Sequence, residues 1–200
     1  IDLPLAVQAF ELLLKRDPRT ILLLAGPTEH DVRGMVSGES VMSNVKALGP
    51  VAYKLLPKYL AAADLFLMPY SNKVSNVGRW PNKVGDYMCV GRPTISNPVG
   101  EVKWLFERYD IGALAEPTPK AMADAAAAYI DNPELSARTG EVARETAHAV
   151  FAWNKLIVNL ERYYFDLLDG RLGPFHFQQS PASKHAASFG NAAHAKGTEP

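Results

Sequence analysis

The sequence has 200 residues, of which 48% are hydrophobic, and this length and composition suit one ordinary domain with a sizeable core. The 21 basic and 21 acidic residues cancel, so the charge balance argues against nucleic acid or an anionic surface as a partner. The single cysteine, Cys89, excludes an internal disulfide framework and predicts a reducing, cytoplasmic location.

The first part of the chain predicts helices that alternate with buried strands. Apolar residues at helical spacing predict a first helix that ends at Asp17-Pro18. Short apolar runs then predict a fully buried strand within residues 20–26, a short strand within 44–51 and a third, buried strand within 64–70. The polar residues 28–43 predict a loop with a weak helix, and residues 53–63 a helix with Pro57 in its first turn. Because the chain opens inside a helical pattern without methionine, we expect a fragment that lacks an N-terminal part.

The alternation continues after a connection of about ten residues, 71–80, which is long for such a loop. Pro81 suits the first position of the next helix, and Gly91 suits its left-handed cap. Further strands are predicted within 93–97 and 111–116, with helices at 101–109, from Thr118, and from Pro133 to Leu168. Residues 169–200 are rich in Ala, Ser, Gly, Pro and His and are predicted to be a disordered tail.

Residues 1–168 therefore predict an α/β domain of the Rossmann-like, three-layer type, in which helices cover both faces of a parallel sheet. Such sheets bind ligands beyond the carboxyl ends of their strands. That rule brings the loops "AGPTEH", "GPVAYK" and "PYSNKVSNVGRWPNK" to one edge of the sheet.

The helix after Pro81 has the features of a phosphate-binding helix. The start of a helix carries free amides and roughly half a positive charge. The side chain of Lys83 can add its own positive charge there. Asp86 lies off the predicted core stripe, roughly 7–8 Å along the helix, where its carboxylate can accept hydrogen bonds from ribose hydroxyls. The alternative is that Lys83 and Asp86 form an ordinary surface ion pair. The predicted core stripe is Trp80, Val84, Tyr87 and Met88.

Three segments together resemble the C-terminal domain of GT-B glycosyltransferases, in particular the large retaining group that uses nucleotide-activated sugars. They are "VKALGPVAYKLLPKYLAAADLFLMPY", "PNKVGDYMCVGRPTISNPVGEV" and "FAWNKLIVNLERYY", which occur in the order of that family. The second segment matches the family pattern "K-x-x-E-Y-M-A-x-G-x-P" at Lys83, Asp86, Tyr87, Met88, Gly91 and Pro93.

The resemblance implies roles for individual residues of a nucleotide-sugar site. Asp86 matches the second acidic residue of a paired motif and would bind the ribose, while Asn82 and Lys83 would hold the diphosphate through backbone amides. Gly26 would line the donor cleft, and the backbone at Val51 would contact the base. The first glutamate of the pair, which contacts the donor sugar, is replaced by Gly78.

The implied function is transfer of a sugar from a nucleoside-diphosphate sugar to an acceptor such as a glycan or a lipid-linked saccharide. The resemblance implies no metal and no other cofactor, and it assigns no catalytic residue to this chain. The acceptor site would belong to an N-terminal domain that precedes residue 1, together with any peripheral membrane contact, so we expect the chain alone to be inactive. "FAWNKL" resembles the segment that returns to that domain. A nucleotide-sugar epimerase of the same fold and a non-catalytic nucleotide-binding module are the alternatives.

Overall fold

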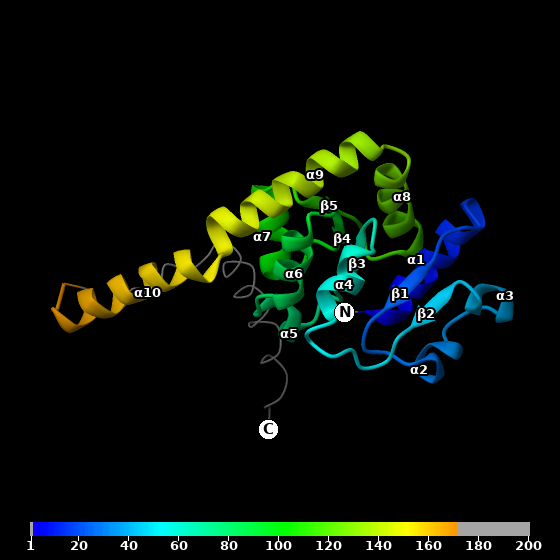
Figure 1. Ribbon diagram of the computed structural model, residues 1–200, viewed down its shortest axis with the longest axis horizontal. Coiled ribbons are helices and arrows are strands. Elements are labelled where there is room, and N and C mark those ends of the chain that lie inside the picture. Colours follow the sequence, from blue (N-terminus) through cyan, green and yellow to red (C-terminus); the bar gives the residue numbers. More distant parts are fainter. Residues whose placement is uncertain (1, 172–200) are drawn as a thin grey trace, which may run out of the picture. The chain divides into compact units, whose positions relative to one another are not determined.

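The computed structural model describes residues 2–171 (Figure 1). The chain divides into a compact unit of residues 1–155 and a second unit that begins at Leu156. Most of the predicted tail, from residue 172 onward, lies outside the described residues. None of the helices within residues 2–171 is both long enough and apolar enough to span a membrane.

The described elements follow the predicted alternation. The strands are β1 (Leu22–Leu24), β2 (Val45–Ala47), β3 (Phe66–Met68), β4 (Thr94–Ser96) and β5 (Gly112–Leu114). The helices are α1 (Leu3–Arg16), α2 (Glu29–Arg33), α3 (Glu39–Met42), α4 (Leu56–Ala61), α5 (Val74–Val77), α6 (Asn82–Val90), α7 (Gly100–Arg108), α8 (Pro119–Ile130), α9 (Pro133–Thr146), the π-helix η1 (Ala147–Phe151) and α10 (Trp153–Leu168).

All the described strand pairs are parallel, as predicted. The strands form two sheets, one in which β1 pairs with β2 and one with the order β3-β4-β5. The prediction of a fully buried first strand is wrong, because each residue of β1 is only half-buried. β1 has a single strand neighbour in its sheet, whereas the central strand β4 pairs on both sides and is buried throughout.

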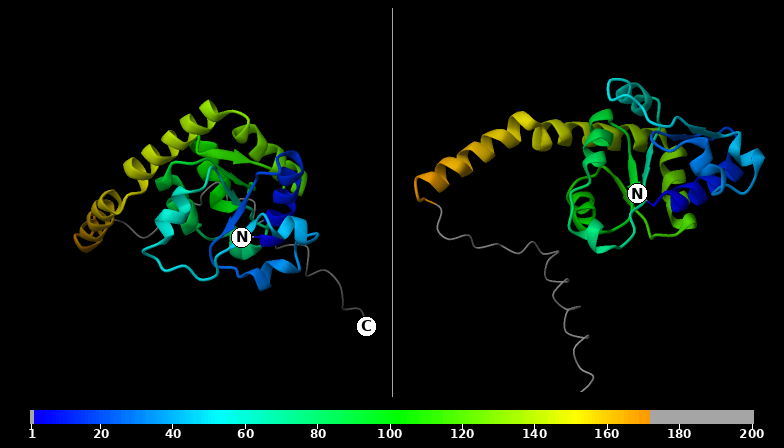
Figure 2. Two further views of the ribbon diagram at one scale, coloured as in Figure 1. Left: turned by 45° about the vertical axis from the view of Figure 1, so that its right-hand side comes forward. Right: turned by 90° about the horizontal axis from the view of Figure 1, so that it is seen from below.

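Two apolar cores enclose the sheet β3-β4-β5 and give the predicted three layers (Figures 1 and 2). On one face α1 and α8 pack side by side over Leu67 and Ile95. On the other face α6, α7 and α9 pack over Met68 and Leu114. Leu67 and Met68 are neighbours in β3 that point to opposite faces, as the two-residue period of a strand requires.

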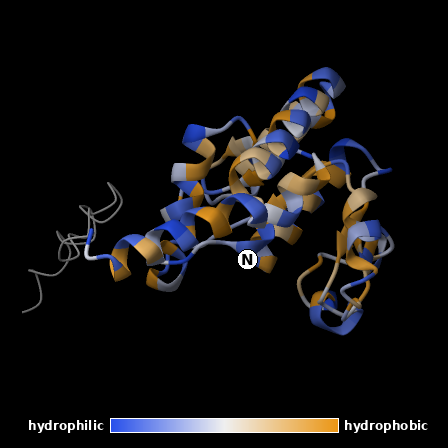
Figure 3. Cartoon of the chain, turned by 60° about the vertical axis from the view of Figure 1, so that its left-hand side comes forward, coloured by the Kyte–Doolittle hydropathy of each residue, from blue (hydrophilic) through white to orange (hydrophobic). Residues whose placement is uncertain are grey.

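α1 joins two cores because its apolar residues fall on two faces. Leu5, Ala9 and Leu13 recur every four residues and pack in the core with α8. Val7 and Phe10 lie on another face and form a small core with buried residues of α2, α3 and β2. Other helices also alternate apolar and polar residues along their length, as the orange and blue segments of Figure 3 show.

The helical pattern predicted from Pro133 to Leu168 is interrupted. α9 passes into the π-helix η1, and Ala152 then takes an extended backbone (φ −67°, ψ 137°) before α10 begins. In the second unit, α10 carries exposed apolar residues at helical spacing, among them Leu156, Leu160 and Leu167.

Substitution of Gly140 tests how closely α9 approaches the end of α6. A Cβ on Gly140 would lie 2.2 Å from the backbone oxygen of Gly91, so the two segments must move apart to accept it. We expect Gly140→Ala to lower the free energy of unfolding by about 1–3 kcal/mol, measured in urea. Gly85→Ala is the matched control: it faces open space within α6 and should stabilise by about 0.5–1 kcal/mol. Equal effects of the two substitutions would contradict the packing described here.

Candidate nucleotide-binding site

The buried carboxamide of Asn97 ties together the carboxyl ends of three strands. The backbone N–H of Tyr70, just after β3, donates to Asn97 Oδ1 at 2.8 Å. Asn97 Nδ2 donates to the backbone oxygen of Ala115, just after β5, also at 2.8 Å. Next to it, Ser96 Oγ donates to the backbone oxygen of Met68 at 2.6 Å. These buried bonds fix the point at which the chain leaves β3.

The connection from β3 to α6 was predicted as a loop, but it contains the short helix α5. Asn76 in α5 is buried, and its Nδ2 donates to the backbone oxygen of Ser71 at 2.8 Å and to its Oγ at 3.2 Å. The guanidinium of Arg79 lies over the ring of Tyr70, 5.4 Å from its centroid. The segment is therefore folded back on the end of β3.

Gly100 allows α5 to lie against the start of α7. Its backbone has φ +51°, and a Cβ there would lie 2.4 Å from the backbone oxygen of Val77. Only glycine meets both conditions without displacing α5 or straining the backbone.

α6 begins with unpaired backbone amides. Pro81 is its N-cap, with an extended backbone (φ −82°, ψ 97°), so the prediction that Pro81 takes the first helical position is wrong by one residue. Pro81 has no side-chain acceptor to offer, and within residues 2–171 the N–H groups of Asn82 and Lys83 have no acceptor. Gly91 ends the helix with φ +75°, as predicted.

The faces of α6 agree with the prediction except at Trp80. Val84 and Met88 are fully buried, and the half-buried ring of Tyr87 stacks on Phe66 with 4.0 Å between centroids. Trp80 is 37% exposed, because it precedes the N-cap and so does not lie on the helical stripe.

The three polar residues predicted on α6 are all free to meet a ligand. Asn82, Lys83 and Asp86 are exposed. Lys83 and Asp86 do not form the surface ion pair considered above, and in the described part of the chain no side-chain hydrogen bond engages any of the three. Their side-chain charges and hydrogen-bonding groups therefore have no partner among residues 2–171.

The other two predicted site residues lie on loops that are hydrogen-bonded to each other. Gly26 has φ +114°, and its N–H donates to the backbone oxygen of Gly49 at 2.8 Å. The N–H of Gly49 returns a bond to Pro27 at 2.9 Å. Val51 follows two residues later and is half-buried. Within residues 2–171, no hydrogen bond joins these two loops to α6.

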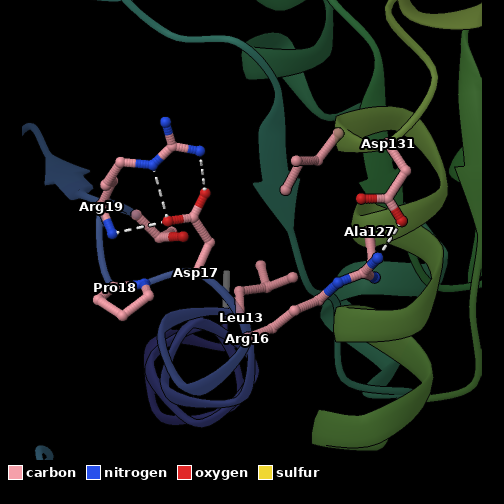
Figure 4. A pocket seen from close by; sticks show the side chains of 9 residues that line it. Leu13, Arg16, Asp17, Pro18, Arg19, Ala127 and Asp131 are labelled. Carbon is pink, nitrogen blue, oxygen red and sulfur yellow. Dashed lines mark hydrogen bonds and ion pairs between the residues drawn. The ribbon is translucent and has the colours of Figure 1, made fainter.

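A pocket lies elsewhere, beyond the carboxyl ends of α1 and α8 (Figure 4). Arg16 reaches across it to Asp131, and Arg19 pairs with Asp17 at 2.8 Å. This pairing, together with two hydrogen bonds from Arg19, lowers the pKa of Asp17 to about 2. Both cations are thus neutralised, and the pocket precedes β1 instead of following a strand. We do not take it as the ligand site.

Metal ligands do not gather in the described part of the chain: no group of three or more His, Cys, Asp and Glu side chains in residues 2–171 is placed to hold an ion. Asn97 could not be identified from the sequence, since Asn-Pro after a strand also suits an ordinary turn. The role of Gly100 could not be inferred from the sequence either. It depends on contact with α5, and the connection 71–80 was not predicted to contain a helix.

Comparisons with solved structures define the class of the fold. Sucrose-phosphate synthase from Thermosynechococcus elongatus superimposes with a TM-score of 0.69 and 18% identity, over 84% of this chain and 44% of that chain. Anabaena HepE in complex with UDP superimposes with a TM-score of 0.65 and 20% identity, over 81% of this chain and 44% of that chain. The fold is that of the GT-B glycosyltransferases, as the resemblance implied.

The sequence profile described as "Glycosyl transferases group 1" matches residues 2–146, and the chain belongs to that family. N-acetyl-alpha-D-glucosaminyl L-malate synthase of Bacillus anthracis is 27% identical over 164 residues, 81% of this chain and 41% of that protein. Alpha-D-kanosaminyltransferase of Streptomyces kanamyceticus is 25% identical over 128 residues, 63% of this chain and 32% of that protein. The chain thus spans less than half of each of these relatives.

Tyr87 provides a pH test of the packing of α6. Burial, with a smaller contribution from the charge of Asp86, raises the pKa of Tyr87 to about 12. The unfolded chain releases this proton near pH 10, so the stabilising contribution is complete below pH 10 and is lost as the pH rises to about 12. Between these pH values we expect the wild type to lose about 2–3 kcal/mol more unfolding free energy than Tyr87→Phe. Parallel losses in urea titrations would contradict the burial of the phenol.

Asn97→Leu should destabilise the chain by about 2–4 kcal/mol, because it leaves the N–H of Tyr70 and the backbone oxygen of Ala115 buried without partners. Asn132→Leu is a weaker control, since Asn132 is an exposed N-cap with one bond to Leu135 N–H and should cost about 1 kcal/mol. Thermal and urea unfolding measure both. A smaller loss at Asn97 than at Asn132 would show that the buried carboxamide does not hold the strand ends.

Proposed function

We propose that this chain is the donor-binding part of an enzyme that transfers a sugar from a nucleoside-diphosphate sugar to an acceptor such as a glycan or a lipid-linked saccharide. The observation that carries the proposal is the start of α6. Free amides at Asn82 and Lys83 are followed, about one turn later, by the unpaired carboxylate of Asp86.

The spacing fits a nucleoside diphosphate. The diphosphate is placed at the amides of Asn82 and Lys83, where the helix dipole and the Lys83 ammonium attract negative charge. Asp86 lies roughly 4–6 Å further along the helix axis and accepts hydrogen bonds from the ribose hydroxyls. The backbone at Val51 contacts the base, and the loop at Gly26 lines the donor cleft.

Transfer breaks the bond between the anomeric carbon and the oxygen of the outer phosphate. The acceptor hydroxyl oxygen takes its place on that carbon, and the hydroxyl proton passes to the departing diphosphate or to water. The departing diphosphate gains negative charge, which positive groups must stabilise. The α6 amides and Lys83 supply this stabilisation, and Arg79, held over Tyr70, adds a guanidinium just before the helix. The proposal therefore needs no metal ion and no further cofactor.

The relatives support sugar transfer in particular over the epimerase of the same fold. Both curated relatives are named for transfer or synthesis of a sugar-containing product, and HepE was solved with UDP. We assign the acceptor, and any peripheral membrane contact, to an N-terminal domain beyond this chain, with which the exposed apolar face of α10 would pack. The chain alone should bind donor without transferring sugar, in the cytoplasm of the cell.

A non-catalytic nucleotide-binding module is the second candidate, and Gly78 favours it. Gly78 is the exposed C-cap of α5 and has no side chain with which to contact the donor sugar. A module of this kind would bind a nucleoside diphosphate and its sugar conjugate equally well, whereas a transferase would also hold the sugar.

Calorimetric titration with UDP, GDP, ADP and TDP tests the proposal. Asp86→Ala should weaken binding of the preferred diphosphate by about 1–3 kcal/mol, through loss of the ribose contacts. Asp124→Ala, an exposed aspartate on α8 over the other face of the sheet, is the control and should bind like the wild type. EDTA should leave the affinity unchanged. A wild-type chain that binds none of the four nucleotides would remove both candidate functions, and full affinity in folded Asp86→Ala would remove Asp86 from the site.

A further inference from the structure

Trp80 links the start of α6 to a distant part of the chain. The segment 71–79 is folded back on the end of β3 by Asn76 and Arg79, but these contacts stop short of Trp80. The ring of Trp80 packs instead on the ring of Phe151, with 5.3 Å between centroids and an interplanar angle of 33°. Phe151 is the last residue of η1 and lies within the same compact unit.

Phe151 is itself held from a second side. Its ring meets the edge of Tyr109, the C-cap of α7, at 6.0 Å. Tyr109 in turn contacts Trp104 at 6.3 Å, and the guanidinium of Arg108 covers both rings. A row of aromatic rings therefore runs from α7 through η1 to the residue before the N-cap of α6.

The π-helix keeps Phe151 on the face that meets this row. Ala143, Ala147 and Phe151 recur every four residues and all pack with the core over the β3-β4-β5 sheet. Four residues of α-helix turn about 40° beyond a full circle, so a row with this spacing drifts around the helix. A π-helical turn contains more residues and reduces the drift. η1 thus directs Phe151 toward the core side, where Trp80 lies.

We propose that Phe151 is a positioning residue for nucleotide binding, because its contact with Trp80 holds the first turn of α6 in the conformation that receives the diphosphate. The inference rests on the proposed function of α6. An aromatic pair contributes about 0.5–1.5 kcal/mol, which changes the equilibrium constant for ordering the first turn by a factor of about 2 to 13 and the population of the ordered conformation by at most that factor. Apparent affinity falls in proportion to that population. Phe151 lies on η1 and is not among the residues assigned to the ligand.

The test compares affinities for the preferred nucleoside diphosphate among UDP, GDP, ADP and TDP, measured by calorimetry well below the unfolding temperature of every variant. Phe151→Leu should weaken binding measurably, by up to about 13-fold, and Phe151→Tyr, which keeps the ring, should keep wild-type affinity. Trp104→Leu is the matched control: it removes a ring of the same row that contacts Tyr109 and not Trp80, and it should bind like the wild type.

A double substitution separates positioning from a loss of general stability. Because Trp80 and Phe151 act through one contact, Trp80→Leu combined with Phe151→Leu should bind no more weakly than Trp80→Leu alone. Amide hydrogen exchange of Val84, whose N–H donates to the backbone oxygen of Pro81 at 3.0 Å, should without nucleotide be faster in Phe151→Leu than in Trp104→Leu. If Phe151→Leu keeps full affinity, or if Trp104→Leu weakens binding as much, the positioning role is overturned while the proposed function stands. If the wild type binds none of the four nucleotides, the proposed function and this inference both fall.

Discussion

The carboxamide of Asn97 is the interaction on which the geometry of the candidate site depends. Asn97 directly follows β4 and is fully buried. Its carboxamide accepts a hydrogen bond from the N–H of Tyr70, after β3, and donates one to the backbone oxygen of Ala115, after β5. A buried carboxamide that loses its hydrogen-bond partners costs a large free energy of desolvation. The three strand ends therefore cannot move apart without breaking these bonds at that cost. The chain that leaves β3 at Tyr70 therefore starts toward α6 from a fixed position.

The buried and the exposed residues of α6 have different roles. Val84 and Met88 hold the helix in the core, and Gly91 lets it end against Gly140 of α9. Within residues 2–171, Asn82, Lys83 and Asp86 are exposed and make no side-chain hydrogen bond or ion pair. Polar groups held rigidly but left unpaired suit recognition of a polar ligand, since little conformational freedom is lost when they bind.

Features set by local sequence were predictable, and features set by distant contacts were not. Thr118 caps α8, Gly91 ends α6, and the short apolar runs form strands, because each depends on residues close in sequence. α5, the burial of Asn97 and the glycine at position 100 depend on segments that meet only in the folded chain. The candidate site residues of α6 were predicted from helix geometry and family resemblance together, and their binding role stays a prediction. The contact between Trp80 and Phe151 joins residues 71 positions apart, and no local pattern announces it.

The most direct measurement of the central claim is a map of backbone amide resonances during titration with the nucleoside diphosphate that binds. If the diphosphate lies at the start of α6, the N–H signals of Asn82 and Lys83 should move most, since these amides gain hydrogen-bond acceptors that the fold does not supply. Signals near Val51 should also move. Changes that gather instead around Arg16, Arg19 and Asp131, with those of Asn82 and Lys83 unmoved, would contradict the account.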